Sequence, residues 1–226
     1  MNKNGRLNID GAFSHRFFVI LLTVAIFLIT CGQKVMCMPR YIIQSGVQYD
    51  VFDLPPHFVV YDDLDLSNMG LTQLPDLHTV HVLGNFYCDH NMLTTLDNSP
   101  ATVERGFFAD NNRLTTLRGC TPKIPMLFSV HHNLLRTLED GPTYTGGYIC
   151  FNNLLKSLAG VPQNEMVCFD CRNNRLRTLD YAPFMVQTTK YSGNKIPGRK
   201  ITEYLNRVAE YTANVQSGVL KSKYSK

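Results

Sequence analysis

Residues 169–179 read FDCRNNRLRTL, and this short phrase decides the fold. Seven copies of the pattern lie between residues 60 and 200, and six of them are centred on an asparagine. The centres are Met69, Asn91, Asn112, Asn133, Asn153, Asn174 and Asn194, at intervals of 22, 21, 21, 20, 21 and 20 residues. A fixed pattern that returns about every 21 residues is typical of a solenoid, in which each repeat packs against its neighbours.

Apolar residues surround each centre at constant distances. Five and three residues before it, the positions are mostly aromatic, aliphatic or cysteine, and two and five residues after it they are mostly leucine. The two upstream positions are two residues apart, so on a strand they face the same way, and we expect strands of three to five residues with these side chains inward. The asparagine follows at the turn, where we expect its amide to satisfy backbone groups that have left the strand ladder.

The segment that returns to the next strand is short and rich in proline. A coil of 20–22 residues leaves little room for a full helix, and we expect extended or 3₁₀ turns there. The recurring prolines favour this, because proline disfavours helix and fixes turns. They are Pro100, Pro122, Pro142, Pro162 and Pro183.

These repeats resemble those of leucine-rich repeat proteins, most closely the short-repeat class of bacterial, phage and large-virus proteins. Residues 107–122, FFADNNRLTTLRGCTP, follow that pattern over a whole unit, and the resemblance covers about 140 of the 226 residues. It implies a β-rich solenoid, a horseshoe or arc of about seven coils over residues 59–197. It implies nothing about the ligand, because the family binds diverse partners.

The two ends of the repeat region are expected to be capped. Residues 33–58 are the expected N-terminal cap, a worn repeat or a hairpin. At the other end, Ile201, Leu205, Val208, Thr212 and Val215 recur at helical spacing. We therefore expect a helix at 198–217 that covers the last coil, although a membrane-surface or partner helix is an alternative. A basic tail follows at 218–226.

An apolar segment at residues 17–32 follows a basic N-terminal segment at 1–16. Its length lies between those of a signal-peptide core and a transmembrane helix. Three interpretations remain: an uncleaved signal anchor, a cleaved signal peptide of a secreted protein, and a lipoprotein modified at Cys31. All three predict repeats on the extracytosolic or lumenal side, and the signal anchor predicts a single-pass membrane protein.

The cysteines and histidines fit the repeat better than they fit metal chemistry. Cys88, Cys150 and Cys171 occupy an inward position, where a thiol is a small apolar side chain. A bond between Cys150 and Cys171 is possible, but free thiols are favoured. We interpret the Cys168-x-x-Cys171 pair as packing, and the histidines beside the asparagines as turn residues, so no metal site is expected.

The outward strand positions, four and two residues before each centre, form what we call the strand face, which is concave in a horseshoe. The fourth position reads Asp65, Tyr87, Phe108, Ser129, Ile149, Asp170 and Lys190, and the second reads Ser67, Asp89, Asp110, His131, Phe151, Arg172 and Ser192. An apolar middle between acidic and basic residues suits a protein partner. The predicted partner-binding residues are Tyr87, Asp89, Phe108, Asp110, His131, Ile149, Phe151 and Arg172.

The sequence offers no catalytic motif, neither a glycine-rich phosphate loop nor a nucleophile elbow, and no cofactor is expected. The net charge of +4 is mild and predicts no nucleic-acid partner. The expected function is protein–protein recognition by a membrane-anchored or exported module. The alternative is a structural or assembly protein of a virus or cell envelope, with self-association and no soluble partner.

Overall fold

A computed structural model describes residues 41–217 of the chain. The expected membrane segment at 17–32, the basic segments at 1–16 and 218–226 and Cys31 lie outside these residues. Over residues 41–217, no helix combines the length and the apolar character that a membrane span needs.

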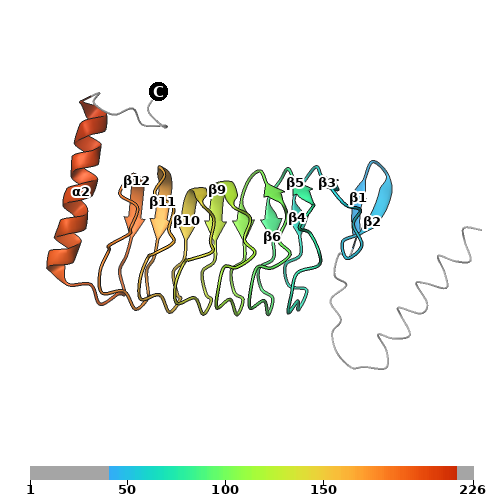
Figure 1. Cartoon of the computed structure of the whole chain (residues 1–226), viewed down its shortest axis with the longest axis horizontal. Coiled ribbons are helices and arrows are strands. Elements are labelled where there is room, and N and C mark those ends of the chain that lie inside the picture. The colour runs from blue at the N-terminus through green and yellow to red at the C-terminus, as the bar shows by residue number, and fades with distance from the viewer. Residues whose placement is uncertain (1–40, 218–226) are drawn as a thin grey trace, which may run out of the picture. The chain divides into compact units, whose positions relative to one another are not determined.

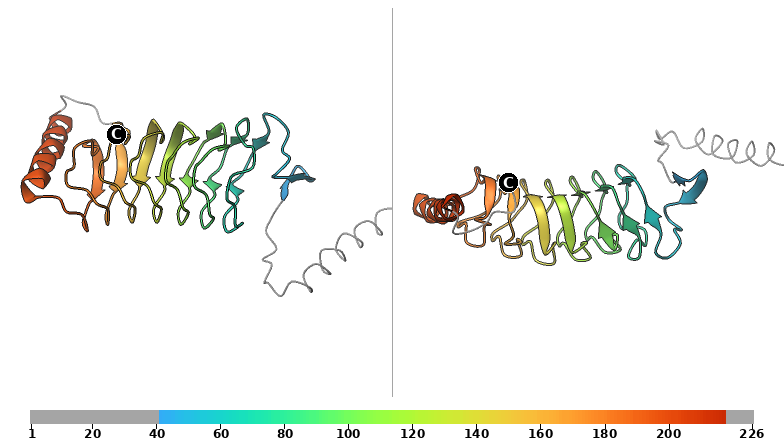
Figure 2. Two further views of the ribbon diagram at one scale, coloured as in Figure 1. Left: turned by 60° about the horizontal axis from the view of Figure 1, so that its bottom comes forward. Right: turned by 90° about the horizontal axis from the view of Figure 1, so that it is seen from above.

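The repeats form a β-solenoid, in which each coil contributes one strand to a seven-stranded parallel sheet (Figure 1). The strands are β4 (Leu64–Asp65), β6 (Phe86–Tyr87), β8 (Phe107–Phe108), β9 (Lys123–Ser129), β10 (Tyr144–Ile149), β11 (Met166–Asp170) and β12 (Val186–Lys190). Each strand pairs with the strand of the next repeat, so that the coils stack in a row (Figure 2). The pairing aligns equivalent positions, as in Phe107 beside Phe128 and Tyr148 beside Phe169, which confirms the register derived from the repeat.

A second parallel sheet, which the repeat pattern did not predict, lies in the first coils. It consists of β3 (Val59–Val60), β5 (His81–Val82) and β7 (Thr102–Val103). At the corner between the two sheets, side chains accept the hydrogen bonds that backbone carbonyls accept within a sheet. The Asp63 carboxylate accepts the Asn85 N–H at 2.7 Å, and the Asn85 side-chain oxygen accepts the Gly106 N–H at 2.9 Å.

The later coils replace this corner by one longer strand. The strand length is two residues in β4, β6 and β8 and five to seven residues from β9 onward. The expected length of three to five residues is met by β11 and β12, whereas β4, β6 and β8 are shorter and β9 and β10 are longer. The first strands are short because the side-chain bonds at the corner interrupt the backbone ladder there.

The inward positions form one continuous core. Aromatic rings stack edge to face along the solenoid, with centroid distances of 4.9 Å for Phe86–Phe107, 5.6 Å for Phe107–Phe128 and 5.1 Å for Phe128–Tyr148. The leucines after each centre are buried from Leu93 to Leu179. No helix lies between the strands of the described coils, as expected for so short a return.

The asparagines form a ladder of hydrogen bonds between coils. Asn133 is typical: its Nδ2 donates to the Ala109 carbonyl of the preceding coil at 3.0 Å and to the Val130 carbonyl of its own coil at 3.1 Å. Its Oδ1 accepts the Leu114 N–H at 2.9 Å. The same cross-coil bonds recur at Asn91, Asn112, Asn153, Asn174 and Asn194.

The residue before each centre has a left-handed backbone. This φ is 53° at His90, Asn111, His132, Asn152 and Asn173. Asparagine and histidine tolerate the left-handed region better than most residues. In the last repeat glycine takes this position, with a φ of 72° at residue 193. The backbone therefore explains the residue types here, and His90 and His132 are turn residues.

A hairpin precedes the first coil, as one of the two expected forms of the cap. Strands β1 (Tyr41–Gln44) and β2 (Val47–Asp50) are antiparallel, and the turn residues Ser45 and Gly46 both have positive φ, as a type I′ turn requires. The Gln44 amide donates to the Val59 carbonyl at 2.8 Å and accepts the Tyr61 N–H at 3.2 Å. It thereby satisfies backbone groups at the open edge of β3.

The helix α2 (Gly198–Gln216) follows the last coil. Tyr204 is its one buried side chain, and its hydroxyl lies 2.7 Å from the Thr189 Oγ1 and donates to the Pro183 carbonyl at 2.9 Å. Val208 packs against the core, whereas Leu205 is 48% exposed. Leu205 and Thr212 are both exposed, so their expected place in the covering face was wrong, and Tyr204 is the helix residue that is buried there.

The cysteines of the described residues are all free thiols. Cys88, Cys150 and Cys171 are fully buried in the core, and burial raises the pKa of the Cys171 thiol to about 12. They therefore act as apolar packing residues in the described coils.

Replacement of Leu135 by alanine tests the register directly. Leu135 is fully buried, and its deletion should lower the free energy of unfolding by about 2–5 kcal/mol. Its neighbour Leu134 is 45% exposed, so Leu134→Ala is the matched control and should change stability by about 0.5 kcal/mol or less. Urea denaturation of both variants measures the difference, and equal losses would contradict the inward assignment.

Candidate interaction surface

The strand face carries two aromatic clusters and not one continuous apolar patch. The first comprises Tyr87 and Phe108 on β6 and β8, and the second surrounds Phe151 just after β10. In the sheet, Ser129 of β9 lies between Phe108 and Ile149, which separates the clusters. The prediction therefore identified the outward residues but not this division.

Tyr87 and Phe108 stack on each other across neighbouring strands. Their ring centroids are 4.8 Å apart and the ring planes differ by 11°. Gly106 makes room for this pair, because a Cβ there would lie 2.7 Å from the Phe108 ring. Both side chains stay partly exposed, and partial burial raises the pKa of the Tyr87 hydroxyl. The pair is a preformed aromatic surface that borders water.

Phe151 is held between two polar side chains. The His131 ring stacks on it at 4.4 Å, and the Arg172 guanidinium lies 5.3 Å from its centroid. The His132 ring meets Phe151 edge-on at 5.2 Å. Arginine over an aromatic face is a favourable cation–π arrangement. The cluster therefore presents an aromatic ring, two imidazoles and a cation on neighbouring coils.

Arg172 forms a bidentate ion pair with Asp170. The Arg172 Nε donates to Asp170 Oδ1 at 2.9 Å, and Nη2 donates to Oδ2 at 2.7 Å. Asp170 is itself only 6% exposed. This pairing orients the guanidinium over Phe151 and leaves Arg172 partly exposed for a partner. Asp170 is a residue of the site that the prediction omitted, although its outward position could have indicated it.

Asp110 was predicted to contact a partner, but its carboxylate is nearly buried and accepts hydrogen bonds from within the chain. It is 8% exposed and accepts the Ser129 hydroxyl at 2.6 Å and the His131 N–H at 2.9 Å. Burial raises the pKa of Asp110 to about 6 despite these bonds. The main effect of Asp110 is to position His131, whose Nε2 lies 3.4 Å from the second carboxylate oxygen.

The order of these groups does not match a nucleophilic triad. In such a triad the histidine lies between the hydroxyl and the carboxylate. Here Asp110 lies between Ser129 and His131, so the carboxylate and not the imidazole accepts the hydrogen bond from the hydroxyl. Burial and the neighbouring His132 also lower the pKa of His131.

The remaining predicted contact residues lie at the border of the clusters. Asp89 is partly exposed and bonds the His90 ring at 2.6 Å, and Ile149 is partly exposed beside Asp170. No group of three or more potential metal ligands comes together within residues 41–217.

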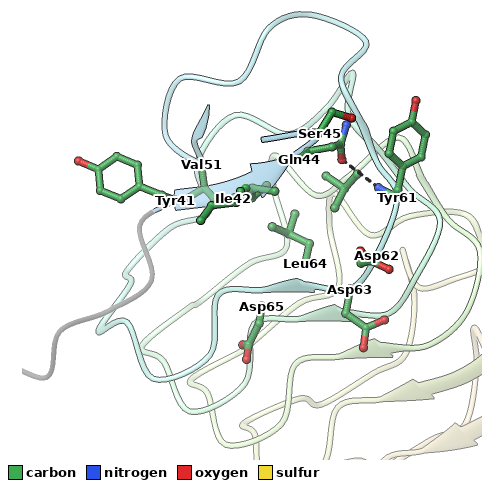
Figure 3. A pocket seen from close by; sticks show the side chains of 12 residues that line it. Tyr41, Ile42, Gln44, Ser45, Val51, Tyr61, Asp62, Asp63, Leu64 and Asp65 are labelled. Carbon is green, nitrogen blue, oxygen red and sulfur yellow. Dashed lines mark hydrogen bonds between the residues drawn. The ribbon is translucent and has the colours of Figure 1, made fainter. Parts of the chain in front are cut away.

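A separate pocket of about 390 Å³ lies between the N-terminal hairpin and the first coil (Figure 3). Ile42, Val51 and Leu64 line its apolar side, and Figure 3 shows Asp63 and Asp65 at the opposite rim. Both carboxylates already accept hydrogen bonds, Asp63 from Asn85 and Asp65 from Ser67. Asp62 also lines the pocket, and no hydrogen bond or ion pair of its carboxylate is seen within residues 41–217.

Parallel strands, inward leucines and the asparagine ladder together define the class of this fold, a leucine-rich repeat solenoid. No family model matches the chain, and no curated protein does. One similar solved structure is that of a Shigella effector LRR domain, with a TM-score of 0.46 and 20% identity over 66% of this chain and 76% of that chain. The assignment of the class rests on the coils themselves.

The buried Asp110 predicts a local dependence of stability on pH. Its pKa is about 6 when folded and 3.8 unperturbed, so the folded state binds the proton more tightly and loses stability as pH rises from about 4 to above 6. Between these pH values the wild type should lose up to about 3 kcal/mol of its free energy of unfolding. Asp110→Asn should abolish this loss. Urea denaturation at both ends of this range measures it, and identical pH profiles of wild type and variant would contradict it.

Proposed function

We propose that this chain is a recognition module that binds a protein partner through the strand face. The observation that carries the proposal is the pair of ordered aromatic clusters on a surface that borders water. Solenoids of this class serve as binding scaffolds, because their strand faces offer an extended array of variable side chains.

The fold does not require aromatic residues at these positions. The equivalent outward positions in the terminal coils hold Asp65, Ser67, Lys190 and Ser192. Aromatic and arginine side chains are the types that contribute most to protein interfaces. Their presence in the middle coils alone therefore favours a binding role over a structural one.

The clusters are also preorganised. Tyr87 and Phe108 restrict each other by stacking, and Asp170 holds Arg172 above Phe151. A side chain that is already ordered loses less conformational entropy on binding. The mixed charges around the rings suit a protein surface better than a uniform polyanion.

Replacement of Phe108 and Phe151 by aspartate tests the proposal. The double variant should remain folded and lose capture of the partner by about tenfold or more, because it removes both aromatic anchors. Val167→Ser is the control, since Val167 is 47% exposed and belongs to neither aromatic cluster. Circular dichroism checks the fold, and quantitative capture with crosslinking compares the three proteins.

The results separate the two functions. Capture of a common protein by wild type and control but not by the double variant supports recognition. Equal capture by all three overturns the role of the strand face. Loss of self-association instead, measured by sedimentation, favours the alternative, a structural or assembly protein of a virus or cell envelope without a soluble partner.

We further propose that residues 17–32 anchor or export the chain, with the repeats extracytosolic or lumenal. The support is the uncharged apolar run after a basic segment. Protease protection with fractionation of a C-terminally tagged chain checks this proposal. In closed vesicles whose interior is the lumenal side, we expect a membrane-bound chain whose repeats are protected from added protease. Full digestion of the repeats in these vesicles would contradict the proposal.

A further inference from the structure

A basic groove of about 630 Å³ lies outside the strand face, on the turns that follow the asparagines. Its lining includes four cationic residues from three successive coils and no acidic residue. The four are Lys156, Arg175, Arg177 and Lys195. The mild net charge of the chain gave no sign of this groove, because the repeat brings together cations that are far apart in sequence.

These cations have no partner within the described chain. Other basic side chains do: Arg118 pairs with Asp97, Arg172 with Asp170, and Lys200 with Glu203. Within residues 41–217, no carboxylate lies within ion-pair distance of the four groove cations, and their side chains make no hydrogen bond. All four side chains are exposed, so they are available to an anion that enters the groove.

The repeat does not require these charges. Three residues after the centre, the first coils hold Thr72, Thr94 and Thr115, whereas the later coils hold Arg136, Lys156 and Arg177. One residue after the centre, Met92, Leu134 and Leu154 stand where other coils hold Arg113, Arg175 and Lys195. Both positions therefore tolerate neutral residues, and only the coil of Asn174, at the middle of the groove, holds a cation at both.

We propose that this groove binds a small anion that carries two or more phosphate or sulfate groups. The planar guanidinium of arginine can donate two hydrogen bonds to the oxygens of a phosphate or a sulfate group. The two lysines add positive charge on the flanking coils. Neighbouring coils are about 5 Å apart, so the cations of three coils are matched by several linked anionic groups better than by one. The volume is in the range of small-molecule sites.

Calorimetric titration of the full chain with tripolyphosphate tests the proposal. At about 50 mM salt, where screening is weak, we expect saturable binding at one site that weakens as salt is raised. Arg175→Gln with Arg177→Gln should weaken binding by about tenfold or more. Arg105→Gln with Lys123→Gln is the control, because it removes the same charge from exposed positions outside the groove.

The control should bind within about twofold of wild type, since each groove contact is intact. A parallel titration with sucrose octasulfate identifies whether sulfate or phosphate is preferred. Equal weakening in both double variants, or no saturable binding, overturns the proposal. Binding of a DNA duplex without binding of either small anion also overturns it, in favour of a macromolecular polyanion. If the arginine variant does not fold, Lys156→Gln with Lys195→Gln gives the same comparison.

Discussion

The asparagine ladder is the interaction on which the rest of the structure depends. Each coil leaves its strand at a turn, where backbone carbonyls and N–H groups lose their ladder partners. A buried asparagine supplies two donors and an acceptor there, as Asn133 does for Ala109, Val130 and Leu114. Because buried backbone groups without partners are costly, this side chain holds successive coils in register.

Register in turn determines which side chains meet. The inward positions form an aromatic and leucine core, and the outward positions are free to vary from coil to coil. The two surfaces with a proposed function both lie at such variable positions: the aromatic clusters around Tyr87 and Phe151, and the basic groove around Arg175. The repeat thus separates residues that hold the fold from residues that are available to ligands.

The class of fold and the outward residues could be predicted, because a strict period constrains both. Features that arise between coils could not. Asp110 was expected to face a partner, but Ser129 and the His131 backbone occupy its carboxylate. Tyr204, whose hydroxyl meets Thr189 of the last strand, was missed because helical spacing alone does not say which face of a helix meets the last coil.

The sequence by itself determined the solenoid, its register and the inward core, since a 21-residue period with asparagine and leucine at constant positions is satisfied by stacked coils. Only the tertiary structure showed the second sheet, the ring stacking within the two aromatic clusters and the hollow that the basic residues line. Their physical reason is the same in each case: they depend on how side chains of neighbouring coils bond, stack or repel one another. Such contacts join residues about 20 positions apart, and no local pattern encodes them.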